Sequence, residues 1–489
     1  MSTLLSLTIT FLDDRFHGQG DRGPEWPPSP HRLYQAMLCA AARNHGDAEE
    51  EFRWFETLGP PEILSPQTTP APTIEMFVPN NDADVPSKYA RQNRLTSKTM
   101  SPLRMQGDST TVRYLWSVRQ EDVSMAERIV QHVRRITAVG WGINLVVADA
   151  QVIDAENPQW QNGMVQWLPA SSGPNILRCP VPGTLDDLRE VYQSFLDRVD
   201  GKFYQAPRRP TAFREVAYRA TGDTVLSRPY VAFNLLRPND DSGRSASFDQ
   251  RRAVHLAEWV RGRACLLSDP EKGGRFLDGY DSNVYVRGYV SEEAKRGPSP
   301  PRFSYLPIPS IGHDHVDGRI RRFIVAGPYG GEYAPIGWAK QNLNLQILTD
   351  NSHQSQATLE LARNDTVIGR YINGGRTPSK TFRTVTPVFL TGHDDRNYRK
   401  TEKMLLKAIE QAGFSLENID DLFLQKAPFF PGAYHPRDYC LPKYIKQHHS
   451  SIHVRIAWKH TVRGPLAIGA GRYLGLGLFA TIGEGTTDL

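Results

Sequence analysis

A glycine-rich segment near the C-terminus holds the most suggestive arrangement of chemically useful residues. Its notable residues are Arg463, Gly469, Gly471, Arg472, Tyr473, Gly475 and Gly477. Glycines let a main chain approach a phosphate backbone closely and point N–H groups at it, arginines add positive charge, and a tyrosine can stack on a base. The segment therefore predicts contact with a nucleic acid. A glycine-rich turn between terminal strands is the simpler alternative.

The same glycines do not predict a dinucleotide-binding site. That motif needs a strand before it, and a helix and a second strand after it, within about thirty residues. Only ten residues follow Phe479, which leaves too little chain for the helix and the second strand. We therefore expect no Rossmann-type unit at this position.

A second stretch, residues 426–446, alternates cations with tyrosines. The cations are Lys426, Arg437, Lys443 and Lys446, and the tyrosines are Tyr434, Tyr439 and Tyr444. Basic groups can follow phosphates while tyrosines stack on unpaired bases. A solvated loop explains the pattern equally well, so both interpretations stay open.

The first part of the chain predicts a few elements around a long irregular stretch. The predicted elements are a strand at 3–12, helices at 31–43 and 121–135, and a strand at 142–149. Ser29 is expected to cap the first helix, which Pro30 opens. Residues 60–111 show no sustained periodicity, so they predict a long loop or insertion with little order of its own.

Beyond a proline- and base-rich stretch at 202–214, one order of elements occurs twice. The first round has a strand at 230–236, a helix at 248–267 and strands at 303–309 and 320–326; the second has a strand at 384–390, a helix at 397–412 and strands at 421–426 and 451–458. Two βαββ-type units in sequence predict paired ferredoxin-like (RRM-like) folds. We place the domain boundary near residue 222.

Composition limits the class of protein without naming it. The 489 residues predict two or three domains, and a net charge of +5 permits nucleic-acid binding but does not show it. The four cysteines are far apart and form no CxxC pair, so neither a zinc ribbon nor a thioredoxin-type site is expected. With no signal peptide and no run of about eighteen apolar residues, we expect a cytoplasmic protein without a membrane partner.

Several stretches, spread in a consistent order over nearly the whole chain, resemble one known family. They are Arg15–Gly18 with Glu25–Leu33, Phe213–Val216, Leu306–Gly318, Thr384–Val388 and the glycine-rich tail. In these stretches the chain resembles the fused CRISPR-associated subunit of the type I-U (also called I-G) interference complex.

The resemblance implies two functional halves. Residues 1–222 are similar to the five-type Cas backbone subunit, which in relatives holds the 5′ handle of the guide RNA (crRNA). Residues 223–489 are similar to the six-type Cas endoribonuclease, which cuts repeat RNA and often stays on the 3′ product. An α+β fold is therefore expected, with an RRM-like module and insertions in the first half. The second half should hold tandem βαββαβ modules at about 223–380 and 381–489.

The resemblance also implies partners and contacts. The expected partners are CRISPR repeat RNA or crRNA, the other subunits of a type I interference (Cascade-like) complex and, indirectly, target DNA. Besides the glycine-rich segment, the expected RNA contacts are Arg208, Arg209, Arg319, Arg321, Arg322, Arg437, Lys443 and Lys446.

The reaction of this family is internal transesterification. The ribose 2′-hydroxyl attacks the adjacent phosphate and expels the 5′-oxygen, leaving a 2′,3′-cyclic phosphate. Because the RNA supplies the nucleophile, neither a metal nor another cofactor is expected. The protein must remove a proton, for which histidine is suited, and offset the developing negative charge with lysine or arginine.

His313 and His315 are our first choice for the base. They lie in the predicted hairpin after residue 309, which a βαββ unit would bring near the start of the helix at 248–267. Asp317 is placed to orient one of them. His255, on that helix, is the competing candidate, although packing in the helix would also explain a histidine there.

Two other functions stay open. A purely structural RNA-binding subunit would bind repeat RNA without cutting it. A metal-dependent phosphohydrolase would use His313, Asp314, His315 and Asp317 as ligands, but a ligand set confined to one tight loop can hardly wrap an ion. Cleavage without a metal is the function that we favour from the sequence.

Overall fold

The chain forms two compact units, Met1–Ala170 with Asn175–Asp223 (unit 1) and Ser171–Pro174 with Thr224–Leu489 (unit 2). The division between Asp223 and Thr224 falls beside the boundary predicted near residue 222. The computed structural model describes residues 3–43, 48–79, 95–154, 163–200, 203–240, 242–290, 300–311, 316–363, 365–373, 379–442, 444–445 and 449–481. Within these ranges, no helix is long and apolar enough to cross a bilayer.

Unit 1 is built on six elements in βαββαβ order. They are β1 (Thr3–Phe11), α1 (Pro30–Ala42), β5 (Glu62–Ser65), β10 (Thr111–Val118), α3 (Val123–Val133) and β11 (Val146–Asp154). Their strands lie in the order β11-β1-β10-β5, and β12 (Val165–Ala170), β16 (Phe213–Ala220) and β13 (Asn175–Pro180) extend them to a seven-stranded antiparallel sheet. This is the element order of ferredoxin-like folds.

The apolar face of β1 explains this arrangement. Leu5, Leu7 and Ile9 alternate along the strand and are almost completely buried. They belong to one core with Met37 of α1 and Ile129 of α3, so both helices pack on the sheet through side chains at helical spacing. The predicted strand and helices therefore form, although β11 begins four residues later than the predicted 142–149.

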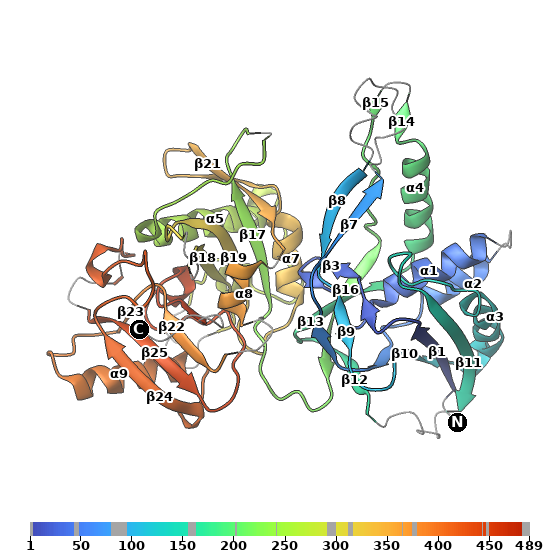
Figure 1. The fold of residues 1–489 in the computed structure, drawn as a ribbon. Helices are drawn as coiled ribbons and strands as arrows, with labels where there is room; N and C mark the ends of the chain where they lie inside the picture. Colours follow the sequence, from blue (N-terminus) through green and yellow to red (C-terminus); the bar gives the residue numbers. More distant parts are fainter. Residues whose placement is uncertain are drawn as a thin grey trace. The chain divides into compact units, whose positions relative to one another are not determined.

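Insertions complete unit 1, and Figure 1 shows that β7, β8 and α4 project from its sheet. The inserted elements are β2 (Arg15–Phe16), β3 (Gln19–Gly20), β4 (Gly23–Pro24), α2 (Glu49–Phe55), β6 (Thr68–Pro70), β7 (Ile74–Pro79), β8 (Leu95–Met100), β9 (Leu103–Met105), η1 (Gln120–Asp122), α4 (Thr184–Leu196), β14 (Val199–Asp200) and β15 (Phe203–Tyr204). The prediction that residues 60–111 have little order was wrong for the described residues 60–79 and 95–111, because these contain strands β5 to β9.

The start of α1 also differs from the prediction. Pro30 does open the helix and Ser29 occupies the N-cap position, but the Ser29 side chain makes no capping hydrogen bond. The Glu25 carboxylate acts there instead. Its Oε1 accepts hydrogen bonds from the backbone N–H of Ser29 (2.8 Å) and from Nε of Arg32 (2.9 Å). A charged acceptor thus replaces the predicted hydroxyl at the positive end of the helix.

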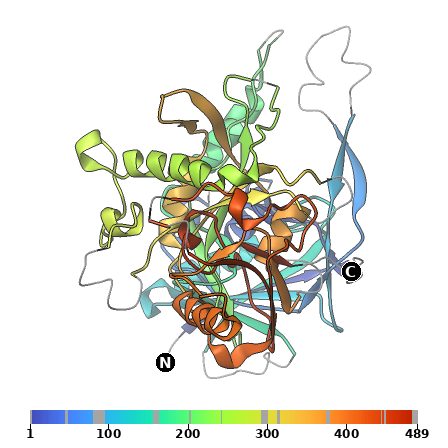
Figure 2. The ribbon, with the colours of Figure 1, turned by 90° about the vertical axis from the view of Figure 1, so that its left-hand side faces the viewer.

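The first module of unit 2 is a second βαββαβ arrangement. It contains β17 (Tyr230–Leu236), α5 (Ala253–Leu267), β18 (Ser304–Pro309), β19 (Ile320–Ala326), α7 (Ala334–Leu343), β20 (Ile347–Thr349) and β21 (Ser355–Leu361), with η2 (Gln250–Arg252), η3 (Pro270–Lys272) and α6 (Ser282–Tyr285) between them. The strands form an antiparallel sheet in the order β18-β19-β17-β21-β20. Figure 2 shows α5 lengthwise. The strands predicted at 230–236 and 320–326 have the predicted bounds.

The second module follows α8 (Thr366–Ile372) and is built around β25. Its elements are β22 (Thr381–Thr384), β23 (Val388–Phe389), α9 (Tyr398–Gln411), η5 (Leu416–Asn418), β24 (Ile419–Gln425), η6 (Pro436–Asp438), β25 (Ser451–Trp458), η7 (Arg472–Leu474) and β26 (Phe479–Thr481). Strand β25 pairs with β24, β22 and β23, and β22 pairs with β26. Residues 459–478, all described, contain only the turn η7, so the prediction of a complete βαββαβ second module was wrong.

The glycine-rich segment explains why the second helix is missing. Gly469, Gly471, Gly475 and Gly477 all have positive φ, between 61° and 93°, which a right-handed helix excludes. The turns also bring the backbone against its neighbours. A Cβ on Gly475 would lie 2.5 Å from Cδ of Pro307 in the first module, and one on Gly469 would lie 2.6 Å from the carbonyl oxygen of Phe389.

This segment therefore belongs to the core of unit 2. Leu466, Ile468, Leu476 and Leu478 are completely buried. Leu478 joins the core that contains Leu306 of β18, whereas Leu466 and Ile468 join the core of the second module. The simpler interpretation of the glycines, a turn between terminal strands, describes how this segment packs. The segment connects the two modules.

We predict that Gly477→Ala destabilises unit 2 by about 2–4 kcal/mol, because the methyl group would meet the carbonyl oxygen of Ile468 at a positive φ. Gly279→Ala is the matched control. Gly279 has φ +83° but open space around its Cβ position, so only about 1 kcal/mol of backbone strain is expected. Urea unfolding of both variants checks this, and equal losses would contradict it.

Candidate functional site

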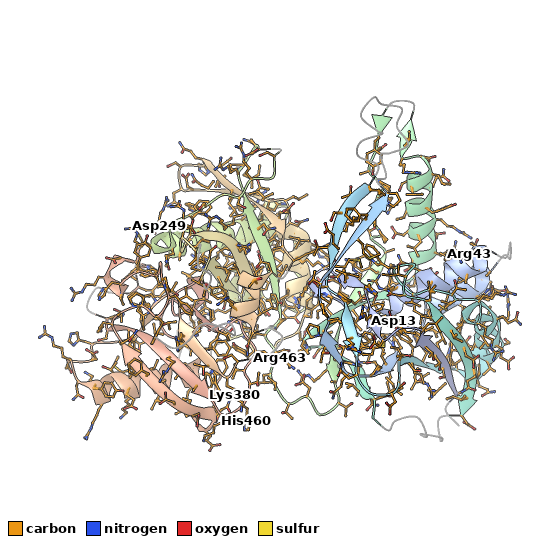
Figure 3. The ribbon with its side chains drawn as sticks, viewed as in Figure 1. Asp13, Arg43, Asp249, Lys380, His460 and Arg463 are labelled. Carbon is orange, nitrogen blue, oxygen red and sulfur yellow. The ribbon has the colours of Figure 1, made fainter. Side chains whose placement is uncertain are left out.

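Three segments that are distant in sequence meet at the start of α5. Asp249, labelled in Figure 3, caps the turn η2 through a hydrogen bond from the backbone N–H of Arg251 to its Oδ1 (2.9 Å). The same carboxylate accepts bonds from Nε and Nη2 of Arg251 (2.9 and 2.6 Å). His255 follows in the first turn of α5, where it is exposed while Val254 and Leu256 are buried. Packing therefore does not explain this histidine, and its side chain is open to solvent.

The hairpin between β18 and β19 reaches the same place. Its residues 312–315, which include His313 and His315, lie outside the described residues. On its described side, Phe248 and Ile320 exchange two backbone hydrogen bonds (2.9 and 2.8 Å). A Cβ on Gly318 would lie 2.9 Å from Nε2 of Gln250. The described flank of the hairpin thus lies against the start of α5, as the βαββ order predicts.

The basic and tyrosine-rich stretch supplies the third side. Nε2 of the buried Gln250 donates to the carbonyl oxygen of Gly432, and the Tyr439 hydroxyl donates to its Oε1 (2.9 Å). The Cys440 backbone N–H donates to the carbonyl oxygen of Arg251 (3.0 Å). The Arg251 guanidinium lies 4.7 Å from the centre of the Tyr434 ring. We call residues Gln250–His255, Asp317–Arg319 and Gly432–Cys440 the helix-start cluster.

The predicted arginines on β19 and immediately before it have different partners. Arg321 pairs with Asp317 (2.8 and 2.5 Å), which lowers the pKa of Asp317 to about 2. Arg322 pairs with Asp365 (2.5 Å). Arg319 instead donates to the hydroxyl and carbonyl oxygens of Ser247 (2.6 and 2.9 Å), which are neutral. Asp317 is therefore engaged by an arginine, where the sequence suggested that it would orient a histidine.

The remaining predicted contacts are scattered. In unit 1, Arg208 pairs with Asp187 (2.5 Å) and Glu190, and Arg209 is exposed. In unit 2, Arg437 is exposed within the helix-start cluster, whereas Nη1 of Arg463 donates to the carbonyl oxygen of Val225 (2.9 Å). Lys443 and Lys446 lie outside the described residues.

Part of the glycine-rich segment lines a pocket of about 620 Å³. Gly469–Leu474 form one wall, and the other arginines around it are Arg261 of α5, Arg287 and Arg302. Two guanidinium groups contact the Tyr473 ring, with the Arg302 and Arg472 carbons 3.5 and 4.6 Å from the ring centre. We call this hollow the arginine pocket. No pattern in the sequence points to Arg287 and Arg302, because both lie outside the helices and strands.

No group of three or more histidine, cysteine, aspartate or glutamate side chains in the described part of the chain is arranged to hold a metal ion. Asp317, one of the four ligands considered for a metal, is paired with Arg321.

A model of one protein family matches residues 5–481, and its description reads CRISPR-associated protein, GSU0054 family. The chain belongs to this CRISPR-associated family. A solved structure described as "Crystal structure of Csm1-Csm4 cassette in complex with pppApApA" matches 32% of this chain and 72% of that chain at 9% sequence identity, with a TM-score of 0.16. This likeness is too small to carry an argument. The comparison with curated proteins finds no match.

One histidine of this GSU0054-family chain holds the tyrosine-rich stretch in place. His453 on β25 is completely buried, with Nδ1 3.1 Å from Oγ1 of Thr384 and Nε2 3.3 Å from the carbonyl oxygen of Tyr434. Burial lowers the pKa of His453 from its ordinary value of 6.5 to about 4. The folded protein therefore keeps this imidazole neutral at pH values where the unfolded chain would protonate it.

We predict an acid-sensitive stability that depends on His453. Between pH 6.5 and 4 the unfolded chain binds the extra proton, so stability that is fully present above pH 6.5 is lost as the pH falls toward 4. At pH 5 this histidine should account for a loss of about 2 kcal/mol. His453→Gln should remove that part of the difference between urea unfolding at pH 7 and at pH 5. His460→Gln, at an exposed position beyond the end of β25 (Figure 3), is the control and should keep it; an unchanged difference in His453→Gln would contradict the assignment.

Proposed function

We propose that the chain cuts CRISPR repeat RNA by metal-independent transesterification and then stays bound to the crRNA in a type I interference complex. The observation that supports cleavage most directly is the helix-start cluster. There an exposed imidazole, His255, shares one site with the described flank of the loop that contains His313 and His315. A basic, tyrosine-containing segment borders the same site.

The cluster contains the groups that this reaction needs. An imidazole takes the proton from the ribose 2′-oxygen as that oxygen bonds to phosphorus, and the bond from phosphorus to the 5′-oxygen then breaks. A proton donor, water or a protonated side chain, completes the 5′-hydroxyl. Arg319 is the arginine best placed to offset charge on the phosphorane, because its guanidinium bonds only to neutral oxygens of Ser247 among the described residues.

Unit 1 would hold the 5′ handle of the crRNA. This part of the proposal rests on the family membership and on the βαββαβ order of its elements, which is the order of RRM-like RNA-binding modules. Arg209 is exposed on the chain before β16 and is available to a phosphate, whereas Arg208 is neutralised by Asp187 and Glu190.

We predict that the purified protein cuts its cognate repeat RNA in the presence of EDTA. RNA with a 2′-deoxyribose at the cut should bind and stay intact, because it lacks the nucleophile. Alanine at the histidine that acts as base, His313, His315 or His255, should lower the single-turnover rate about a hundredfold or more. His460→Ala, at an exposed position well separated from Asp249 of this cluster (Figure 3), should cut at the wild-type rate.

Other outcomes of these cleavage assays would favour a different function or reject the proposed site. Loss of cleavage in EDTA would favour a metal-dependent phosphohydrolase. Tight binding without cleavage of the unmodified RNA would favour a structural RNA-binding subunit. Full activity in all three histidine variants would reject the helix-start cluster as the site of cleavage, even if the RNA is cut.

A further inference from the structure

The arginine pocket lies apart from the helix-start cluster, within unit 2. A second hollow of about 840 Å³ adjoins it, and the two share Arg261, Arg287 and Tyr289. No residue of the helix-start cluster lines either hollow. Their sizes are within the range of pockets that hold small ligands. Neither the family match nor the site described above assigns them a ligand.

The electrostatics of the pocket favour an anion. Among the described residues, Arg287 pairs with Asp269 (2.7 Å), but no hydrogen bond or ion pair engages the Arg261 guanidinium. Nη1 of Arg302 donates to the carbonyl oxygen of Gly288 (3.0 Å), which is neutral. Asp281 is the only acidic residue among the described ones that line the two hollows. Within the described part of the chain, neither Arg261 nor Arg302 is paired with a carboxylate.

A buried cation behind the wall adds to this potential. Arg228 is almost completely buried and donates to Gly327 O (2.6 Å), Pro465 O (2.9 Å) and the Ser304 hydroxyl, all neutral acceptors. Ser304 is adjacent to Phe303 and Tyr305, which line the pocket. Because a charge acts over a longer range in a low dielectric, Arg228 makes the pocket more attractive to a phosphate.

Exposed aromatic rings also line the arginine pocket. Tyr289 and Tyr444 line the pocket and are 73% and 59% exposed. Large exposed rings beside guanidinium groups are what unstacked bases and their phosphates bind. An acidic peptide would use the arginines but would leave these rings without a function. The combination therefore favours a nucleotide of single-stranded RNA.

The arginine pocket and the candidate base His255 share one helix, because Arg261 also lies on α5. Arg261 follows His255 by six residues, which is about 9 Å along the helix axis. An RNA strand that has its cut bond at the helix-start cluster would need only a short step along α5 to reach Arg261. The pocket would then hold a nucleotide near the cut, outside the reacting group.

We propose that the arginine pocket binds one unstacked nucleotide of single-stranded RNA, with its phosphate at Arg261 and Arg302 and its base on Tyr289 or Tyr444. This proposal rests on the proposed RNA-binding function and adds a subsite to it. The pocket takes no part in proton transfer, so it should affect binding of the RNA and leave the chemical step unchanged.

Binding of non-cleavable RNA tests the proposal. Fluorescence anisotropy with repeat RNA that carries 2′-deoxyribose at the cut, over a series of salt concentrations, gives affinity and salt slope without any turnover. Arg261→Gln should weaken binding on the order of tenfold and lower the salt slope by about 1. Tyr289→Ala should weaken binding at least about fivefold with an unchanged slope, because stacking does not release counterions.

Arg275→Gln is the matched control, because Arg275 is an exposed arginine of the same unit that pairs with Asp278 (2.9 Å) on the surface. It should bind like the wild type. Arg261→Lys keeps the charge and should keep the salt slope, which separates a phosphate contact from damage to the fold.

The outcomes also separate this proposal from the proposed function. If Arg261→Gln and Tyr289→Ala bind the RNA with wild-type affinity and wild-type salt slope, the proposed nucleotide site is wrong, even if the wild type cuts RNA. Weakened binding in these variants would support the pocket, even if the wild type never cuts. If pocket variants bind RNA normally but lose an acidic protein partner, the ligand assigned here is wrong.

Discussion

Unit 2 depends on close backbone contacts that only glycine allows. Gly475 approaches Pro307 of the first module, and Gly469 approaches Phe389 of the second, at distances that leave no room for a Cβ. The same turns bury leucines of both modules' cores. Because Gly469 and Gly471 also line the arginine pocket, the packing of the modules and the shape of the pocket rest on one segment. A substitution there would change both.

A second constraint acts at the start of α5. The buried amide of Gln250 bonds to Gly432 and Tyr439, which are about 180 residues away in sequence, and Gly318 fits against both Gln250 and Gly432. A buried amide must satisfy its donors and its acceptor, so this arrangement fixes three segments at once. The exposed side chains of the cluster, such as His255, are therefore carried on a rigid base, which proton transfer at a defined distance requires.

The sequence allowed a good prediction of the elements that bury many apolar residues. The strands at 230–236 and 320–326 are runs of mostly buried apolar residues, and the helix that Pro30 opens carries apolar residues at helical spacing; all three form where these patterns predict. The ribbon of β7 and β8 was missed because it buries little on either face: β7 alternates half-buried and exposed residues, and β8 is exposed except for Met100. A second helix was expected in the last module because the βαββαβ order was extended to it by analogy, and that helix does not form. Four glycines with positive φ argue against a helix there.

The candidate RNA contacts show why counting arginines is a weak guide. Arg208, Arg321 and Arg322 looked equivalent in sequence to Arg319, yet each of the three is paired with a carboxylate and has little charge left to offer. Those carboxylates come from Asp187, Asp317 and Asp365, and for two of the pairs the partner lies more than twenty residues away, where no local pattern predicts it. Arg302 and Arg319 bond instead to carbonyl and hydroxyl oxygens, which orient a guanidinium without neutralising it. The partner of an arginine, more than its presence, decides whether it can attract a phosphate, and only the fold determines the partner.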